Sequence, residues 1–333
     1  MSHARDTTGA DRSPLLRALI ARREADRTRR VSDAARPSAP PVTAIVLHWG
    51  ERDATRRCLQ HLLAGAPRDL AVLVVDSTDA ADWAGYDAAG RIRVLRTMRN
   101  EGYAGGNNRA LRAALADGAA FALLLNNDAV IAPDALAHLL ACAARDPRIA
   151  LVGSRLVAAD DPRRDVGSHG RITYGPFLVA IDGAAGPQAA RDAEWVSGCG
   201  VLVRLAALAD IGLLDEDFFL YCEDVDWSLR ARRCGYRVVY EPRAVVAHTP
   251  ATSPAALRRR SYFLARNGLL FARKHGSALE RLKISAAALG LPLASLLRRG
   301  LAGEPLDPSL WVARGVVDGL LGRPPRLRQL GLR

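Results

Sequence analysis

Three acidic residues fall within a stretch of four positions in this chain, at Glu223, Asp224 and Asp226. They follow an aromatic and apolar run at 218–221 and precede a pattern typical of a helix. Burying an unpaired carboxylate is costly, so acids beside hydrophobic residues need a cation, a metal or a substrate proton as a partner. Asp224 is therefore a candidate general base, with Glu223 and Asp226 setting its position and charge. Acids also enrich the first turn of ordinary helices, where they complement the helix dipole, and this alternative stays open.

An alternation of strands and helices must hold these acids in place. Apolar, often β-branched runs predict strands, and apolar residues at helical spacing predict helices. The expected strands are 42–47, 70–75, 92–95, 121–125, 151–153, 195–203, 238–240 and 244–248, and the expected helices are 51–64, 107–116 and 133–144. This order predicts an α/β fold with a doubly wound, mostly parallel sheet and helices on both faces.

Two aspartates follow expected strands closely. Asp76 closes the strand at 70–75, and Asp128 stands three residues beyond the strand at 121–125. In doubly wound sheets, ligands lie beyond the carboxyl ends of the strands, where an Asp can accept hydrogen bonds from a base or a ribose. Each residue could equally be an ordinary turn former.

A glycine-rich stretch at 100–108 precedes the expected helix at 107–116. Its glycines permit close backbone approach, and the N-terminus of the following helix can meet a phosphate group. We take Asn100, Gly105 and Asn107 as its candidate donor-binding residues. The stretch lacks the G-x-G-x-x-G spacing of dinucleotide enzymes, so on its own it is a weak signal.

A possible metal site joins Asn126 and Asp128 to His248, which follows the last expected strand. A carboxylate, a carboxamide and an imidazole can hold a divalent cation whose shell is completed by water and diphosphate oxygens. The alternative is that His248 is a structural residue at the end of its strand.

The formal charge of +12 is distributed unevenly along the 333 residues. Residues 1–41 carry +4 and residues 255–333 carry +11, which leaves −3 for the middle of the chain. A nucleic-acid-binding domain carries its basic face on the fold itself, so this distribution argues against that class. Basic ends beside apolar helices favour an anionic membrane surface instead.

The apolar segment at 284–297 is flanked by basic residues but is too short to cross a bilayer, which needs roughly 20 residues. An amphipathic helix in the membrane interface fits it, as does a helix packed on the domain. The five cysteines show no C-x-x-C spacing, which argues against a disulfide framework or a zinc site and favours a reducing cytoplasm. We expect a flexible basic arm at 1–41 and a basic, apolar helical extension at 255–333.

Taken in order, these segments resemble an inverting glycosyltransferase of family 2 with the GT-A fold, and in particular the rhamnosyltransferase-like branch that builds bacterial surface polysaccharides. The resemblance covers roughly residues 42–275. The matching stretches are 42–49, 74–77, 100–107, 124–128, 198–204, 211–227, 232–240 and 247–248.

The resemblance implies a role for each matching residue. Asp76 would contact the nucleotide base, and Asp224 would be the base of the family's x-E-D motif. Asn126 and Asp128 stand where the family has D-x-D, with Asp128 supporting metal and diphosphate, and His248 would complete the metal site. The chain departs from the family pattern at Gly50 and Ser77, where Asn is common, and at Asn126, which supplies no charge where many relatives have Asp.

The resemblance implies a GT-A domain at 42–254 that transfers a sugar from a nucleotide-diphosphate donor, with dTDP-rhamnose as one candidate. The acceptor would be a hydroxyl of a glycan or a lipid-linked glycan near Asp226 and Trp227. A divalent cation, Mg²⁺ or Mn²⁺, would be the cofactor, and the enzyme would lie on the inner face of the membrane. The alternatives are a catalytically inactive sugar-nucleotide or glycan-binding protein and a nucleotide-dependent oxidoreductase, against which the glycine spacing speaks.

Overall fold

The computed structural model describes residues 17, 18, 20, 21, 41–78, 90–174, 179–181, 189–248, 252–301 and 307–332. Most of the arm expected at 1–41 therefore lies outside the described residues. Within it, the side chain of Ile20 is buried in the main core, so the arm contacts the domain at this point.

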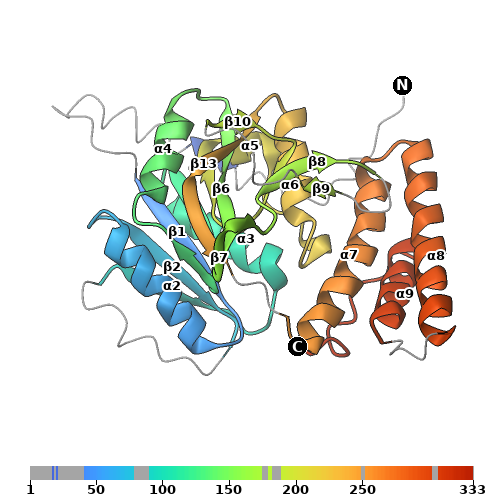
Figure 1. Cartoon of the computed structure of the whole chain (residues 1–333). Helices are drawn as coiled ribbons and strands as arrows, with labels where there is room; N and C mark the ends of the chain where they lie inside the picture. The colour runs from blue at the N-terminus through green and yellow to red at the C-terminus, as the bar shows by residue number, and fades with distance from the viewer. Residues whose placement is uncertain are drawn as a thin grey trace.

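A mixed, mostly parallel sheet forms the centre of the molecule (Figure 1). Its order is β10-β13-β6-β12-β4-β1-β2-β3, with β5 added beside β13 and β7 beside β6. β12 runs antiparallel to both of its neighbours, whereas β3, β2, β1 and β4 are parallel to one another. A smaller sheet has the order β11-β8-β9. The strands are β1 (Val42–His48), β2 (Ala71–Asp76), β3 (Ile92–Arg96), β4 (Phe121–Asn126), β5 (Ala129–Ile131), β6 (Ile149–Ala158), β7 (Asp161–Asp165), β8 (His169–Ile172), β9 (Val179–Ile181), β10 (Arg191–Asp192), β11 (Trp195–Val196), β12 (Val201–Arg204) and β13 (Arg237–His248).

Helices cover both faces of this sheet, because alternate residues of each central strand point to opposite sides. Ala44 and Val46 of β1 pack with α2 and α4, whereas Ile45 packs with α3, α5 and α6 on the other face. The expected doubly wound architecture is thereby confirmed. The helices are α2 (Arg52–Gly65), α3 (Gly102–Ala116), α4 (Ala135–Ala144), α5 (Leu208–Ile211), α6 (Glu223–Arg233), α7 (Pro254–His275), α8 (Ala278–Leu301) and α9 (Asp307–Leu320), with 3-10 turns η1 (Leu205–Ala207) and η2 (Glu216–Phe218).

Three local expectations differ from the structure. The strand expected at 195–203 is divided into β11 and β12, which lie in different sheets. The glycine-rich stretch is not a loop before a helix, because α3 already begins at Gly102. The two short strands expected at 238–240 and 244–248 are one strand, β13, whose pairing with β6 shifts register between Glu241 and Val245. The shift absorbs Pro242, whose missing N–H cannot join a strand ladder.

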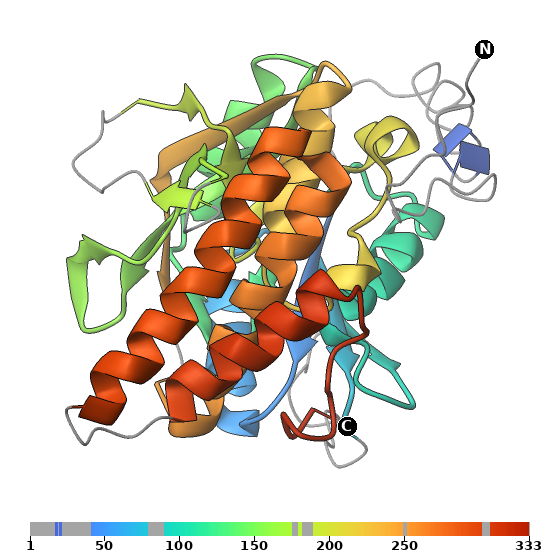
Figure 2. The same ribbon diagram turned by 90° about the vertical axis from the view of Figure 1, so that its right-hand side faces the viewer.

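The C-terminal helices α7, α8 and α9 form a layer on one side of the domain (Figures 1 and 2). Ser253 caps α7 by accepting a hydrogen bond from the Ala256 amide, and Pro254 occupies the first turn. Leu269 of α7, Ile284 of α8 and Val316 of α9 pack in one cluster, so the three helices hold one another. Within the described part of the chain, we find no helix with the length and apolar character needed to span a bilayer.

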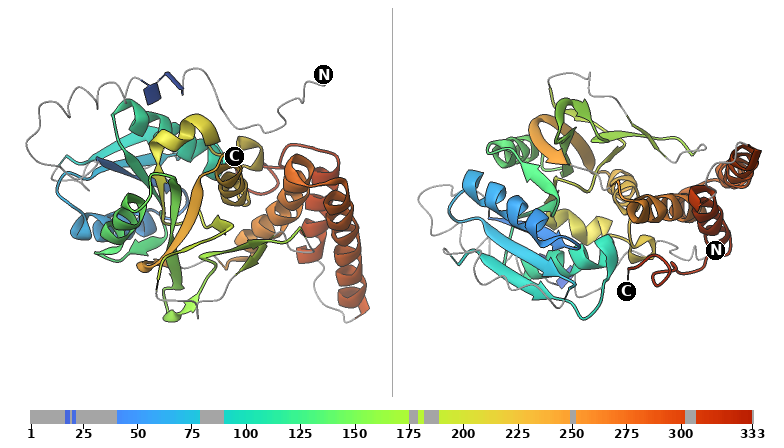
Figure 3. Two further views of the ribbon diagram at one scale, coloured as in Figure 1. Left: turned by 90° about the horizontal axis from the view of Figure 1, so that it is seen from above. Right: turned by 60° about the horizontal axis from the view of Figure 1, so that its bottom comes forward.

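The first of these helices also packs on the sheet domain, as the two views in Figure 3 show. Leu270 and Phe271 of α7 lie in a cluster with Trp195, Phe218 and Val225 from the preceding domain. α7 is therefore continuous with the core, although the sequence places it in a separate extension beginning at 255.

Candidate active site

The carboxyl ends of the central parallel strands bring the predicted donor-side residues together. The strand register pairs His48 at the end of β1 with Asp76 at the end of β2, and pairs Leu47 with Asn126 at the end of β4. Asp76 is buried, and its Oδ1 accepts hydrogen bonds from the amide and the hydroxyl of Thr78 at 2.8 and 2.9 Å. Asp76 thus lies at the sheet edge expected for a base-binding residue.

Asp128 and His248 meet at the same edge because β5 pairs with the end of β13, with Ala129 opposite His248. The Oδ1 atom of Asp128 lies 3.2 Å from Nε2 of His248. The Oδ1 atoms of Asn126 and Asp128 are both buried and accept no hydrogen bond from the described residues. Two such oxygens beside an imidazole fit a divalent cation, for which buried oxygen atoms are the natural ligands. No group of three or more His, Cys, Asp and Glu side chains arranged for a metal occurs in the described ranges, so a bound substrate would have to supply further ligands.

The glycine-rich stretch does not form an open phosphate loop. The Asn100 side chain accepts a hydrogen bond from the Gly102 amide at 2.9 Å, and Asn107 is buried and donates to the Tyr103 carbonyl at 2.8 Å. A Cβ added to Gly105 would lie 2.8 Å from the Cβ of Glu101. The side chains of Asn100 and Asn107 therefore shape the start of α3, and their predicted contact with the donor stays a prediction.

The catalytic candidates begin helix α6 after a turn with unusual backbone angles. Phe219, Tyr221 and Cys222 have positive φ values of 63°, 66° and 72°, a region that non-glycine residues seldom adopt. Asp224 follows directly, with Oδ2 accepting from the Gly198 amide at 3.0 Å and Oδ1 from its neighbour Val225 at 2.8 Å. The Oε2 atom of Glu223 is buried and accepts no hydrogen bond among the described residues.

Burial governs the electrostatics of this pair. It raises the pKa of Glu223 well above its usual range, and the nearby charge of Asp224 raises it further. Burial also raises the pKa of Asp224, although the Gly198 and Val225 amides oppose the shift by stabilising the carboxylate. A carboxylate with a raised pKa and no cationic partner is suited to accept a proton near neutral pH.

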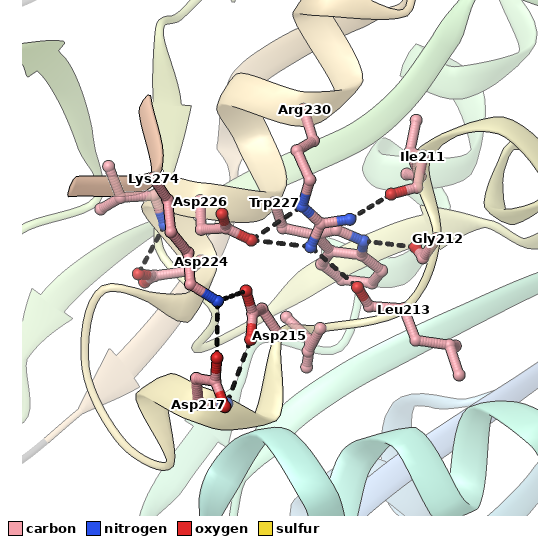
Figure 4. A network of polar contacts seen from close by, with 12 residues as sticks. Ile211, Gly212, Leu213, Asp215, Asp217, Asp224, Asp226, Trp227, Arg230 and Lys274 are labelled. Carbon is pink, nitrogen blue, oxygen red and sulfur yellow. Dashed lines mark hydrogen bonds and ion pairs between the residues drawn. The ribbon is translucent and has the colours of Figure 1, made fainter. Parts of the chain in front are cut away.

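Asp226 and Trp227 do not lie where an acceptor could reach them. Asp226 is completely buried, and its Oδ2 accepts from Nε of Arg230 at 2.8 Å (Figure 4). Its Oδ1 lies 2.6 Å from Nε2 of His275. The Trp227 indole is also buried and donates to the Gly212 carbonyl at 2.9 Å. Their predicted acceptor-side role does not fit this burial, because both side chains are used to hold α6 against the 211–213 segment.

Sequence reasoning missed the contribution of α7 to this region. Lys274 binds the carboxylates of Asp215 and Asp217 at 2.5 and 2.8 Å (Figure 4). The next residue, His275, contacts Asp226. At the other end of α7, the Arg259 guanidinium lies 5.0 Å from the ring centroid of Trp49, just beyond β1. The sequence feature that could have indicated these contacts is the presence of polar residues at 266, 267, 274 and 275 within an otherwise apolar helical face.

The part of the chain that matches a known protein family includes the residues of this candidate site. A family model described as glycosyltransferase-like family 2 matches residues 40–262. The chain is 29% identical over 241 residues to an N-acetylglucosaminyl-diphospho-decaprenol L-rhamnosyltransferase of Mycobacterium tuberculosis, covering 64% of this chain and 76% of that protein. It is also 29% identical over 258 residues to a pre-mycofactocin glycosyltransferase of the same species, covering 76% of this chain but only 52% of that protein.

Two solved structures share the fold. The crystal structure of GalNAc-T7 with UDP, GalNAc and Mn²⁺ has a TM-score of 0.52 at 12% identity, covering 87% of this chain and 59% of that one. The crystal structure of TarS from S. aureus has a TM-score of 0.50 at 17% identity, covering 87% of this chain and 50% of that one. At such identities the likeness concerns the arrangement of strands and helices alone.

Proposed function

Since this chain belongs to glycosyltransferase-like family 2, we propose that it is an inverting glycosyltransferase in which Asp224 is the general base. In the reaction, the acceptor hydroxyl oxygen attacks the anomeric carbon while Asp224 takes its proton. The bond between that carbon and the diphosphate oxygen breaks on the opposite face, so the configuration inverts. One observation carries the assignment: among the described residues, the Asp224 carboxylate accepts hydrogen bonds from backbone amides alone and has no cationic partner. Burial accordingly raises its pKa.

The donor side of the proposal uses the strand ends. Asp76 would contact the nucleotide base, while Asn126, Asp128 and His248 would hold a divalent cation, Mg²⁺ or Mn²⁺. When bound, that cation supplies neutralisation of the negative charge on the leaving diphosphate. The buried Oδ1 atoms of Asn126 and Asp128, which accept no hydrogen bond from the described residues, support this role, because such atoms are costly to bury without a ligand.

The donor and the acceptor are the finer part of the proposal. The relative with 76% coverage is named a rhamnosyltransferase acting on a diphospho-decaprenol. We therefore propose dTDP-rhamnose as the first donor to test, and a hydroxyl of a lipid-linked glycan in surface polysaccharide synthesis as the acceptor.

A panel of nucleotide sugars tests the proposal in two steps. Thermal shift identifies the donor, since a ligand at about 100 times its dissociation constant stabilises a fold by roughly 2.7 kcal/mol. Transfer and donor hydrolysis are then measured with Mn²⁺ and with a chelator. Donor binding without turnover in either assay would favour the inactive, binding-only alternative.

We further propose that the C-terminal layer binds an anionic membrane surface peripherally. Leu279, Leu282 and Leu289 of α8 are 59%, 66% and 58% exposed, and residues 255–333 carry a net charge of +11. Each basic residue near an anionic surface contributes on the order of 1 kcal/mol, and exposed apolar side chains add their burial in lipid.

Point substitutions test this surface better than truncation does. Deleting the tail would remove the Asp318 carboxylate that accepts a hydrogen bond from Tyr262 on α7 at 2.8 Å, and so would disturb the core. The full chain should co-sediment with anionic vesicles, less so at high salt, and the double variant Leu282→Glu, Leu289→Glu should bind less. Equal sedimentation of the variant and the parent would show that these residues of α8 do not contact the membrane.

A further inference from the structure

The turn that precedes the catalytic acids holds three residues with positive φ, at Phe219, Tyr221 and Cys222. None of them is a glycine, so each is held in a conformation that a free chain would seldom populate. Such a conformation persists only where the surroundings impose it. The contacts that impose this conformation on the turn also determine the direction in which the first two residues of α6, Glu223 and Asp224, point.

The strongest contact on this turn comes from Asn267, a fully buried residue of α7. Its Nδ2 atom lies 2.9, 2.8 and 2.7 Å from the carbonyl oxygens of Phe218, Leu220 and Tyr221, which share its two N–H groups as acceptors. Its Oδ1 atom accepts from Nη1 of Arg266 at 2.7 Å, which fixes the orientation of the amide. One side chain thus gathers three backbone carbonyls of the segment that leads into the catalytic helix.

The opposite side of the turn rests on the start of α3. The Ala104 amide donates to the Phe219 carbonyl at 3.3 Å. A Cβ on Gly102 would lie only 2.4 Å from that same oxygen, so Gly102 is required for the close approach. The turn is therefore clamped between α3 on one side and Asn267 of α7 on the other.

We propose that Asn267 is a positioning residue for the transfer reaction, which holds the 219–222 turn so that Glu223 and Asp224 face the reacting groups. The inference rests on the proposed role of Asp224 as the base. It assigns to α7 a part in catalysis that differs from the membrane contact proposed for α8. A merely structural alternative is that Asn267 only fastens α7 to the domain.

The test compares Asn267→Ala with Tyr262→Phe in the full chain. Tyr262→Phe removes a buried hydrogen bond that fastens α7 to α9 without removing any hydrogen bond to the turn. Asn267→Ala should lower kcat by roughly 10²-fold, the effect expected of misplaced catalytic groups, with little change in the KM for the donor. Tyr262→Phe should leave kcat close to that of the parent, because it removes a hydroxyl that contacts Asp318 and keeps the ring in place.

Two further measurements distinguish a role of Asn267 in positioning the turn from a role in the stability of the fold. Hydrogen exchange at the amides of 219–226 should be faster in Asn267→Ala than in Tyr262→Phe at matched unfolding free energy. The acid limb of the kcat profile should move to lower pH in Asn267→Ala, because a loosened turn admits water to Asp224. If both variants lose kcat equally with equal exchange, Asn267 is only a packing residue and the inference is overturned.

A second variant covers the case in which Asn267→Ala does not fold. Asn267→Asp keeps the size and the acceptor for Arg266 but lacks the N–H groups that hold the turn, so it should show the same loss of kcat. Parent-like kcat in Asn267→Asp would overturn the inference. If the parent itself transfers no sugar, the proposed function fails, while hydrogen exchange at 219–226 still decides whether Asn267 holds the turn.

Discussion

Asp224 and Asp226 lie two residues apart on α6, yet they face different surroundings. Within the described ranges, Asp224 accepts hydrogen bonds from backbone amides, among them those of Gly198 and Val225, and burial raises its pKa. Asp226 is buried more deeply, but Arg230 and His275 outweigh the effect of burial and lower its pKa. Because α-helical residues are about 100° apart around the axis, positions two apart point to nearly opposite sides.

The difference shows how partners decide what a buried carboxylate can do. A carboxylate held by backbone amides alone retains affinity for a proton, which a general base needs. A carboxylate bound to a guanidinium and an imidazole has lost that affinity and instead fixes α6 in place. The Arg230 guanidinium also donates to the Ile211 and Leu213 carbonyls, which ties the helix to the preceding segment (Figure 4).

The largest effect should come from removing the proton acceptor. Asp224→Asn keeps the shape of the side chain but cannot take a proton, so transfer should fall by at least roughly 10²–10⁴-fold. Donor affinity measured by calorimetry should stay close to that of the parent. Transfer at a rate near that of the parent would end the assignment of Asp224 as the base.

The opposite outcome is expected two residues later. Asp226→Ala leaves the buried Arg230 without its carboxylate, and breaking a buried ion pair typically costs about 3–5 kcal/mol. The free energy of unfolding should fall accordingly in urea titrations, whereas Asp224→Asn should show no such loss. An equally stable Asp226→Ala would mean that the network around Arg230 does not hold α6.

At the donor side, Asp128→Ala and His248→Ala should both weaken Mn²⁺-dependent donor binding. A charge-assisted contact contributes about 1.5–3 kcal/mol, so roughly a tenfold loss or more is expected. Calorimetry with and without Mn²⁺ measures it, and Asp226→Ala serves as the control for general loosening. Unchanged Mn²⁺-dependent affinity in His248→Ala would make His248 structural and leave Asp128 as the candidate ligand.

The smallest effect concerns the pH dependence of stability. Because the pKa of Asp224 is raised on folding, the folded state binds more protons between the unfolded and folded pKa values, and stability falls as pH rises through that window. Asp224→Asn should therefore be more stable than the parent at neutral pH, by roughly 0.5–2 kcal/mol, and the gain should vanish below about pH 4.

Asp226 should show the reverse trend, because its pKa is lowered on folding. Its contribution to stability is present above the unfolded pKa and is lost as pH falls through the folded value. Unfolding of the parent and both variants across this pH range checks the two signs. A loss of stability on acidification that is identical in the parent and Asp226→Ala would contradict the assigned direction.

Although it did not predict β5 or β7 to β10, the sequence alone predicted the parallel strands β1 to β4 and the placement of Asp76, Asn126 and Asp128 near strand ends. It could do so because buried strands have a local apolar pattern, and ligands gather at the carboxyl ends of parallel strands. The motif order also identified the family, which the match to residues 40–262 confirms.

The Arg230 partner of Asp226 lies one helical turn away and is visible in the sequence, but only the tertiary structure supplied its second partner and left Asp224 without a cation among the described residues. That second partner, His275, lies 49 residues after Asp226, and Asn267 lies 46 residues after Tyr221, so both come close to this region only when α7 packs on the domain. The glycine-rich stretch became the start of α3 for a similar reason, since Gly102 is required by the Phe219 carbonyl more than 100 residues away. The spacing of apolar residues within one element does not predict such distant contacts. They depend on how the elements pack together and not on the pattern within any one of them.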